Sequence, residues 1–145
     1  MQYSFFTNGG AEAIEMALKL ARLATRRKMV HLNCKRIPRK INGAISLGGK
    51  GAYREDYIPM VQQVQHVEYG NADATRAAVK NLIAVGEKVA AIIVEPIQGE
   101  GGVIIPPDGY LKELRAIADE YGVLPDLRRN PDWSGKNWYN VEMRL

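Results

Sequence analysis

The segment from Lys88 to Val94 limits the possible fold more than any other part of this sequence. After the lysine it is a continuous apolar run that includes Ile92 and Ile93. Strands buried on both faces of a parallel sheet have this pattern, whereas strands with one face in solvent alternate between apolar and polar residues. The segment therefore predicts a central strand with helices on both sides, which is an α/β architecture.

Residues 11–24 predict an amphipathic helix that packs against this strand. Acidic residues near its start, Glu12 and Glu15, are favoured by the helix dipole. We expect its apolar face to share a core with Ala91 and Ile93. That face contains Ile14, Ala17, Leu18 and Ala21, and the opposite, exposed face contains Lys19 and Arg22.

Two further helices are expected, one on each side of the apolar run in the sequence. Asp73 and Asp108 are the expected N-caps, and Gly86 and Gly122 are the expected stops. The faces expected to be buried are Ala77, Ala78, Leu82 and Ile83 in the first helix and Leu111, Leu114, Ile117, Ala118 and Tyr121 in the second.

Short strands are expected at 3–7 and 64–69, so that strands and helices alternate with right-handed crossovers. Residues 35–42 and 125–145 have neither the helical nor the strand period. We expect local loss of order at 36–41 and an irregular tail over 125–145.

Length and composition narrow the class of protein. A chain of 145 residues with 46% apolar and 25% charged residues is typical of one soluble globular domain. The absence of a long apolar run argues against a membrane span, and Glu12 and Glu15 argue against a secretory signal. With Cys34 as its single cysteine the chain has no internal disulfide, so we expect a cytoplasmic protein.

The net charge of +4 is concentrated in one stretch. Residues 22–40 hold eight Lys and Arg and no acid, whereas residues 41–124 hold seven basic and eleven acidic residues. A basic block without interleaved aromatic residues offers only attraction to phosphate. Nucleic-acid binding is therefore not the expected function.

Two loops carry candidate chemistry. Two glycines, Gly9 and Gly10, stand between a strand and a helix start, where backbone N–H groups can bind a phosphate; the alternative is a plain turn. After the apolar run come two acids and an amide, Glu95, Gln98 and Glu100, at the strand end where α/β sheets bind ligands. The alternative there is a glycine-rich loop with solvated acids.

Other residues of reactive type lack partners at suitable spacing. His31 and His66 have no cysteine or carboxylate at metal-ligand spacing and are interpreted as ordinary strand residues. Cys34 has no recognisable base and is interpreted as a small buried residue. The sequence therefore predicts no metal site.

Two blocks of the sequence resemble class III aminotransferases, which are pyridoxal-phosphate (PLP) enzymes. The first is Phe5–Arg22 (FFTNGGAEAIEMALKLAR), similar to the family's phosphate loop and following helix. The second is Glu95–Leu111 (EPIQGEGGVIIPPDGYL), similar to the family's E-P-I-Q-G-E-G-G block. The resemblance covers about residues 3–34 and 43–124 and is nearest to the putrescine, ornithine and acetylornithine branch. It implies part of the large domain of fold type I, a three-layer α/β/α domain with a mostly parallel sheet.

The resemblance also implies roles for individual residues. Gly9, Gly10 and Ala11 match the loop that contacts the PLP phosphate, although Gly9 replaces the family's usual serine. Glu95 matches the acid beneath the cofactor ring. Glu100 matches the acid on the substrate side.

The two segments without a period are also where the chain departs from the family. Positions 37–39 replace a motif whose aromatic residue stacks on the ring, and Pro125–Pro131 replaces a D-E-x-Q-T-G strand whose Asp holds the pyridine nitrogen. Codons exist for which reading one base later restores both family motifs. Shifted reading frames are therefore our hypothesis for both segments, and 1–124 is interpreted as the aminotransferase part.

The resemblance implies a parent enzyme that transfers an amino group from an amine or amino acid, such as putrescine or ornithine, to a 2-oxo acid. It also implies a homodimer. The family's Schiff-base lysine lies beyond the matched blocks, so we expect this chain alone to be inactive. The alternative is a non-catalytic phosphate-binding or interaction module with a basic face.

Overall fold

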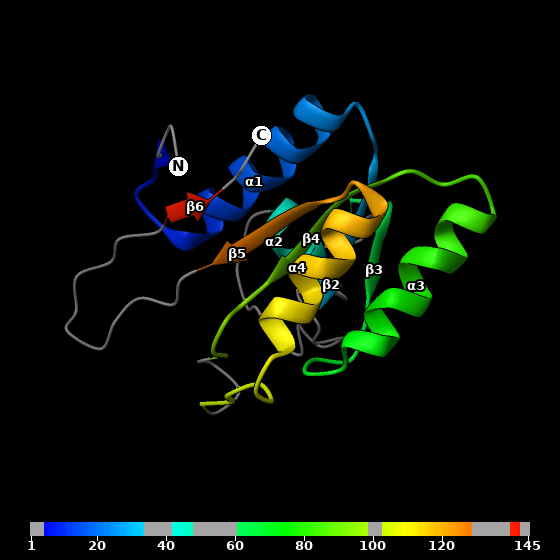
Figure 1. Cartoon of the computed structure of the whole chain (residues 1–145). Coiled ribbons are helices and arrows are strands. Elements are labelled where there is room, and N and C mark those ends of the chain that lie inside the picture. The colour runs from blue at the N-terminus through cyan, green and yellow to red at the C-terminus, as the bar shows by residue number, and fades with distance from the viewer. Residues whose placement is uncertain (1–4, 34–41, 48–60, 99–102, 129–139, 143–145) are drawn as a thin grey trace.

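A computed structural model describes residues 5–33, 42–47, 61–98, 103–128 and 140–142. Its elements are β1 (Phe5–Phe6), α1 (Gly10–Thr25), β2 (Met29–Asn33), α2 (Asn42–Ser46), β3 (Val64–His66), α3 (Ala72–Ala84), β4 (Val89–Val94), α4 (Tyr110–Tyr121), β5 (Leu124–Arg128) and β6 (Asn140–Glu142). The strands form one sheet in the order β1-β6-β5-β4-β2-β3 (Figure 1). Strands β2 to β5 are parallel, and β6 is antiparallel to β5 and β1.

The apolar run forms the expected central strand. All six residues of β4 are buried, between β2 on one side and β5 on the other. One core contains Ala91 and Ile93 with residues of α1 and α2, and a second contains Ile92 and Val94 with residues of α3 and α4. The three-layer α/β/α arrangement is therefore confirmed.

Helix α1 lies as predicted, with one correction. The predicted face is buried, and Ile14 and Leu18 pack in the same core as Ile93. Lys19 is exposed, but Arg22 is only half-exposed. Its guanidinium donates to the carbonyls of Lys28 and Gln62 at 3.1 and 3.4 Å. These bonds connect the end of α1 to the turn that follows it and to the segment before β3.

Helix α3 differs from the prediction in its cap and its buried face. Asn71 is the N-cap, and its side chain accepts a hydrogen bond from the Ala74 N–H at 2.8 Å, so the expected cap Asp73 is wrong. Asn71 holds this position because its backbone is extended, as an N-cap requires. The buried residues are Ala72, Thr75, Ala78 and Val79, whereas Ala77 is exposed and Ile83 is 43% exposed.

Helix α4 has the predicted face but not the predicted cap. Leu114, Ile117 and Ala118 are buried, and Leu111 and Tyr121 pack at the edge of the same core. The N-cap is Gly109, which has no capping side chain, so Asp108 is not the cap. At the other end Gly122 has φ +60°, the left-handed conformation that favours glycine, and ends the helix as predicted.

Helices α3 and α4 are also joined at the surface. Arg76 donates a hydrogen bond to Glu120, and on α4 itself Arg115 pairs with Asp119. These bonds raise the pKa of the two guanidinium groups. Because the side chains are largely exposed, such pairs contribute little to stability.

The outer strands are shorter than expected. Strand β3 ends at His66 rather than near residue 69, and β1 has two residues in the described range. His31 and His66 lie in β2 and β3, as expected of strand residues. Cys34 and residues 36–41 lie outside the described residues.

The tail contains two strands where irregular structure was expected. Residues 124–128 form β5, with Ile93 opposite Asp126, and residues 140–142 form β6. The side-chain pattern does not report this pairing, because β4 presents backbone N–H and C=O groups that need partners whatever side chains the partner carries. Residues 129–139 and 143–145 lie outside the described residues.

The short helix α2 is tied to α1 by a carboxylate. Glu15 Oε1 accepts hydrogen bonds from the N–H groups of Gly43 and Ala44 at 2.5 and 3.1 Å. A Cβ at Gly43 would lie 2.6 Å from the same carboxylate. The contact therefore requires glycine, and it places Ala44 and Leu47 in the core beneath α1.

Arg27 joins three elements at the amino edge of the sheet. Its Nη1 donates to the carbonyl of Val89 at 3.1 Å and to the carbonyl of Gly122 at 2.8 Å. The second carbonyl belongs to the C-cap of α4, where the helix dipole favours a cation. Arg27 thus links the turn after α1 to β4 and to the end of α4.

We predict that Arg27→Met lowers the free energy of unfolding by about 1–2 kcal/mol, because two backbone carbonyls lose a charged donor. Urea denaturation of the whole chain measures this change. Lys28→Met is the matched control, because Lys28 is exposed in the same turn. Equal stability losses in the two variants would contradict the assigned role.

Candidate functional site

Three helices begin at the carboxyl edge of the parallel strands. Helix α3 follows β3 directly, and α4 follows β4 after a long connection, so both begin at this edge. Helix α1 leads within a few residues into the start of β2, so it runs antiparallel to the strands and also begins here. Figure 1 shows the first turns of α3 and α4 at the same end of the sheet. The positive ends of the three helix dipoles therefore lie at this edge.

The start of α1 is organised by local hydrogen bonds. Thr7 Oγ1 donates to the Gly9 carbonyl at 3.0 Å, and the Asn8 N–H donates to the Glu12 carboxylate at 2.9 Å. Gly10 is the first helical residue and is buried, and Ala11 is half-buried. The predicted phosphate turn is therefore a fixed helix start.

Gly9 leaves space at this helix start. Its φ of −162° is extended backbone that any residue adopts, and a Cβ there would meet no atom within 4 Å. Gly9 is the N-cap, and no side chain makes the capping hydrogen bond. The position thus accommodates a side chain or a ligand oxygen.

Glu95 follows β4 at the same edge and is 9% exposed. Val94 is the last residue of β4 that pairs with described residues of β2 and β5, and Glu95 follows it directly. Its carbonyl and that of Pro96 accept from the Tyr69 hydroxyl at 2.9 and 3.0 Å. Glu95 thus follows the buried strand, as expected, whereas Tyr69, which lies in the strand expected at 64–69, is found in the loop after β3.

Gln98 closes the loop that follows. Its backbone N–H and C=O pair with those of Ile104, both at 3.0 Å, in an isolated antiparallel bridge. The side chain is 2% exposed, and its Nε2 is buried with no hydrogen-bond partner among the described residues. A buried amide without an acceptor costs free energy, so Gln98 is a candidate donor to a ligand. Glu100 lies in the bridged loop, outside the described residues.

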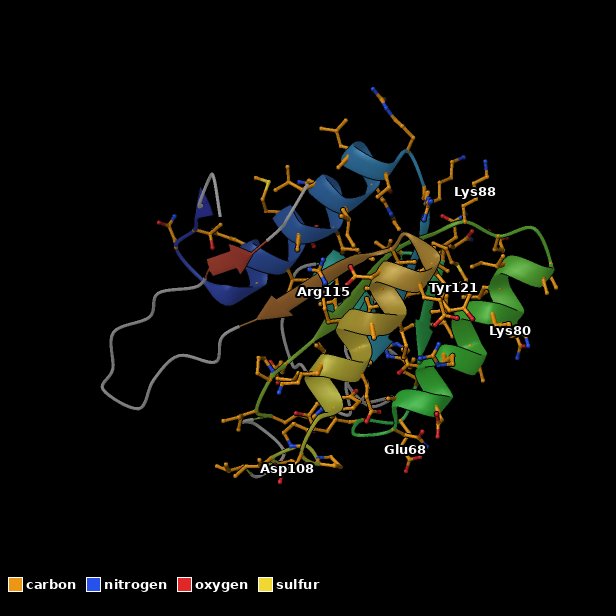
Figure 2. The ribbon with its side chains drawn as sticks, viewed as in Figure 1. Glu68, Lys80, Lys88, Asp108, Arg115 and Tyr121 are labelled. Atoms are coloured by element: carbon orange, nitrogen blue, oxygen red, sulfur yellow. The ribbon has the colours of Figure 1, made fainter. Side chains whose placement is uncertain are left out.

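A cavity of about 410 Å³ opens beside this loop. Its lining residues come from the loop before α3 and from the connection between β4 and α4; they are Glu68, Tyr69, Gly70, Asn71, Ala72, Asp73, Ile104, Ile105, Pro106, Pro107 and Glu113. Figure 2 shows Glu68 and Asp108 at this edge and Lys88 at the opposite one. Among the described residues the lining carries acids and no cation, which does not favour a phosphate there.

Other functional classes find little support among the described residues. No group of three His, Cys, Asp or Glu side chains within those ranges is placed to hold a metal ion. None of the described helices has the length and apolarity needed to span a bilayer. In the basic stretch, Arg22 and Arg27 are engaged with backbone carbonyls.

The sequence profile of the family Aminotransferase class-III matches residues 2–125. The chain belongs to the class III aminotransferases. The match spans both loops of the carboxyl edge and ends in β5.

Solved transaminase structures resemble this chain over most of its length. Ornithine aminotransferase from Toxoplasma gondii ME49 has 31% sequence identity, with a TM-score of 0.76 over 87% of this chain and 31% of its own. Taurine:2-oxoglutarate aminotransferase from Bifidobacterium kashiwanohense has 30% identity, with a TM-score of 0.74 over 87% and 32%. An (S)-enantioselective ω-transaminase from Thermomicrobium roseum has 30% identity, with a TM-score of 0.73 over 86% and 33%. This aminotransferase chain thus spans about a third of the length of these relatives.

We predict that Gly9→Ser raises the free energy of unfolding by roughly a few tenths of a kcal/mol, because serine is the better N-cap and its side chain meets no obstacle. Thermal denaturation measures this change. Gly9→Ala is the control, because it adds the Cβ without a hydroxyl. A serine variant no more stable than the alanine variant would contradict the proposed capping geometry.

Proposed function

We propose that the carboxyl edge of this sheet is the PLP-binding part of an aminotransferase active site. The observation that carries the proposal is that the Gly9–Gly10 helix start and Glu95 lie at the same edge, within the range that matches the family. Support also comes from relatives whose structures are described with PLP, among them the taurine:2-oxoglutarate aminotransferase.

The described residues fit such a ligand. The space at Gly9 admits a phosphate oxygen, and the first turn of α1 offers N–H groups and a positive dipole end. The buried amide group of Gln98 has no acceptor within the described part of the chain, which suits a ligand rich in oxygen atoms. These features favour a phosphorylated cofactor at this edge.

The chain's own residues would divide the work of binding. Gly9, Gly10 and Ala11 would bind the phosphate through the helix start, and Glu95 would supply the buried carboxylate next to the cofactor ring. Glu100, which lies outside the described residues, would supply the acid on the substrate side. When bound, PLP accepts the amino group and takes up the negative charge that forms when the substrate loses a proton.

The parent reaction is amino transfer from an amine or amino acid, such as putrescine or ornithine, to a 2-oxo acid. We propose a cytoplasmic homodimer for the parent enzyme. The chain alone is proposed to be inactive, because the stacking aromatic, the Asp partner of the pyridine nitrogen and the cofactor lysine have no match in its sequence.

We predict no amino transfer when the purified chain is mixed with PLP, putrescine or ornithine, and 2-oxoglutarate. The product glutamate is measured, with a complete ornithine aminotransferase as the positive control. Reduction with borohydride followed by mass spectrometry maps any lysine that PLP modifies. Stoichiometric modification of a single lysine together with turnover would overturn the proposed inactivity, whereas scattered modification of surface lysines agrees with it.

We predict weak, phosphate-dependent binding of PLP, because an exposed helix end contributes only about 0.3–1 kcal/mol. Phosphorus NMR titration measures it, with pyridoxal as the ligand that lacks the phosphate. Glu95→Gln should weaken PLP binding and leave inorganic phosphate unaffected, and Glu113→Gln is the matched control at the same edge. Equal binding of PLP and pyridoxal would contradict the assignment of the phosphate site.

Shifted reading frames are our proposal for residues 36–40 and 125–138. The family match ends at residue 125, which supports a boundary there. Sequencing the encoding DNA tests the idea directly. Codons that do not give the family motifs one base later would exclude it.

A further inference from the structure

One side chain from another element binds two carbonyls of the backbone that presents Glu95. Within the described residues the paired positions of β4 reach Val94, and the next two carbonyls are those of Glu95 and Pro96. Both accept from the Tyr69 hydroxyl, at 2.9 and 3.0 Å. Pro96 has no N–H with which to extend the ladder. The hydroxyl therefore helps to set the direction in which the chain leaves β4.

The hydroxyl is itself fixed by two helices. The Tyr69 ring meets the Tyr110 ring edge to face, with centroids 5.5 Å apart and planes at 66°. Tyr110 is the first residue of α4 and is 2% exposed. Two residues after Tyr69 comes Asn71, the N-cap of α3. Neither helix start can shift without moving the hydroxyl.

The close approach of the loops before α3 and α4 also restricts the position of Tyr69. Gly70 has φ +82°, and a Cβ there would lie 3.0 Å from Pro107 Cδ. The loop before α3 is thus packed against the loop before α4, and Tyr69 reaches between them to the end of β4. Because Tyr69 is held by both loops, its hydroxyl can fix the Glu95 and Pro96 carbonyls that it contacts.

We propose that Tyr69 is a positioning residue for Glu95, acting through the backbone carbonyls of residues 95 and 96. The inference rests on the proposed function, which gives Glu95 its place beneath the PLP ring. Tyr69 contacts the backbone, so it sets the direction of the Glu95 carboxylate without taking part in the chemistry. The Gln98–Ile104 bridge, which starts two residues after Pro96, holds the far end of the same segment.

The competing interpretation is that Tyr69 only fills space between the helices. Tyr69→Phe distinguishes the positioning role from the space-filling role, because it keeps the ring contact with Tyr110 and removes the hydroxyl. The matched control is Thr75→Val, which removes a fully buried hydroxyl of α3 that donates to the Asn71 carbonyl at 3.2 Å.

The test is backbone hydrogen exchange, followed by NMR on the whole chain without added PLP. In Tyr69→Phe we expect the amides of Gln98 and Ile104 to exchange roughly two- to tenfold faster relative to those of Ala91 and Ile93, as loss of one hydrogen bond gives. The carbon resonance of the Glu95 carboxyl should also move. Thr75→Val should change the exchange of all four amides by one common factor and leave that resonance in place.

A Tyr69→Phe variant that behaves like Thr75→Val overturns the proposal. So does a Tyr69→Phe chain that fails to fold while Thr75→Val folds, because a positioning role is local. Titration of the wild-type chain with PLP is a separate measurement. A wild-type chain that does not bind PLP therefore counts against the proposed function and leaves the result on Tyr69 intact.

Discussion

Helices cover β4 on both faces, and every one of its six residues is buried. Because no water reaches this strand, each of its backbone N–H and C=O groups needs a partner from β2 or β5. The two cores share the residues of β4, with Ile93 on the α1 side and Ile92 and Val94 on the side of α3 and α4. Strands β2 and β5 provide the partners for its backbone groups, and the two helical layers bury its two faces.

Patterns confined to one element were readable from the sequence. Burial of Ile14 and Leu18 follows from helical period, and burial of β4 follows from continuous apolarity. The cap of α3 was not readable in the same way. Both Asn71 and Asp73 are suitable cap residues, and the choice depends on where the chain turns after β3. Strand β5 was missed because its pairing is decided by β4, not by its own side chains.

In the candidate site, too, the residues marked by their neighbours in the sequence were predicted, whereas a residue that acts through a distant contact was not. Gly9 and Glu95 were found because a glycine turn before a helix and an acid after a buried strand are contiguous signals. Tyr69 was missed because it meets the Glu95 backbone across 26 positions, and nothing next to Tyr69 in the sequence marks that contact. The amide of Gln98 was recognised as a candidate, but its lack of an acceptor is a property of the packed loop.

The pairing of β1 with β6 has a consequence for the order in which the molecule assembles. Phe5 lies opposite Val141, so this contact closes almost the whole chain into one loop. Loop closure costs more entropy as the loop lengthens, and contacts of long sequence separation slow folding. The pairs within β2, β3 and β4 span much shorter loops. The segment that leads into the glycine turn is thus held by the contact with the greatest sequence separation in the sheet. During synthesis its partner in the described sheet, β6, forms only after residues near position 140 have left the ribosome.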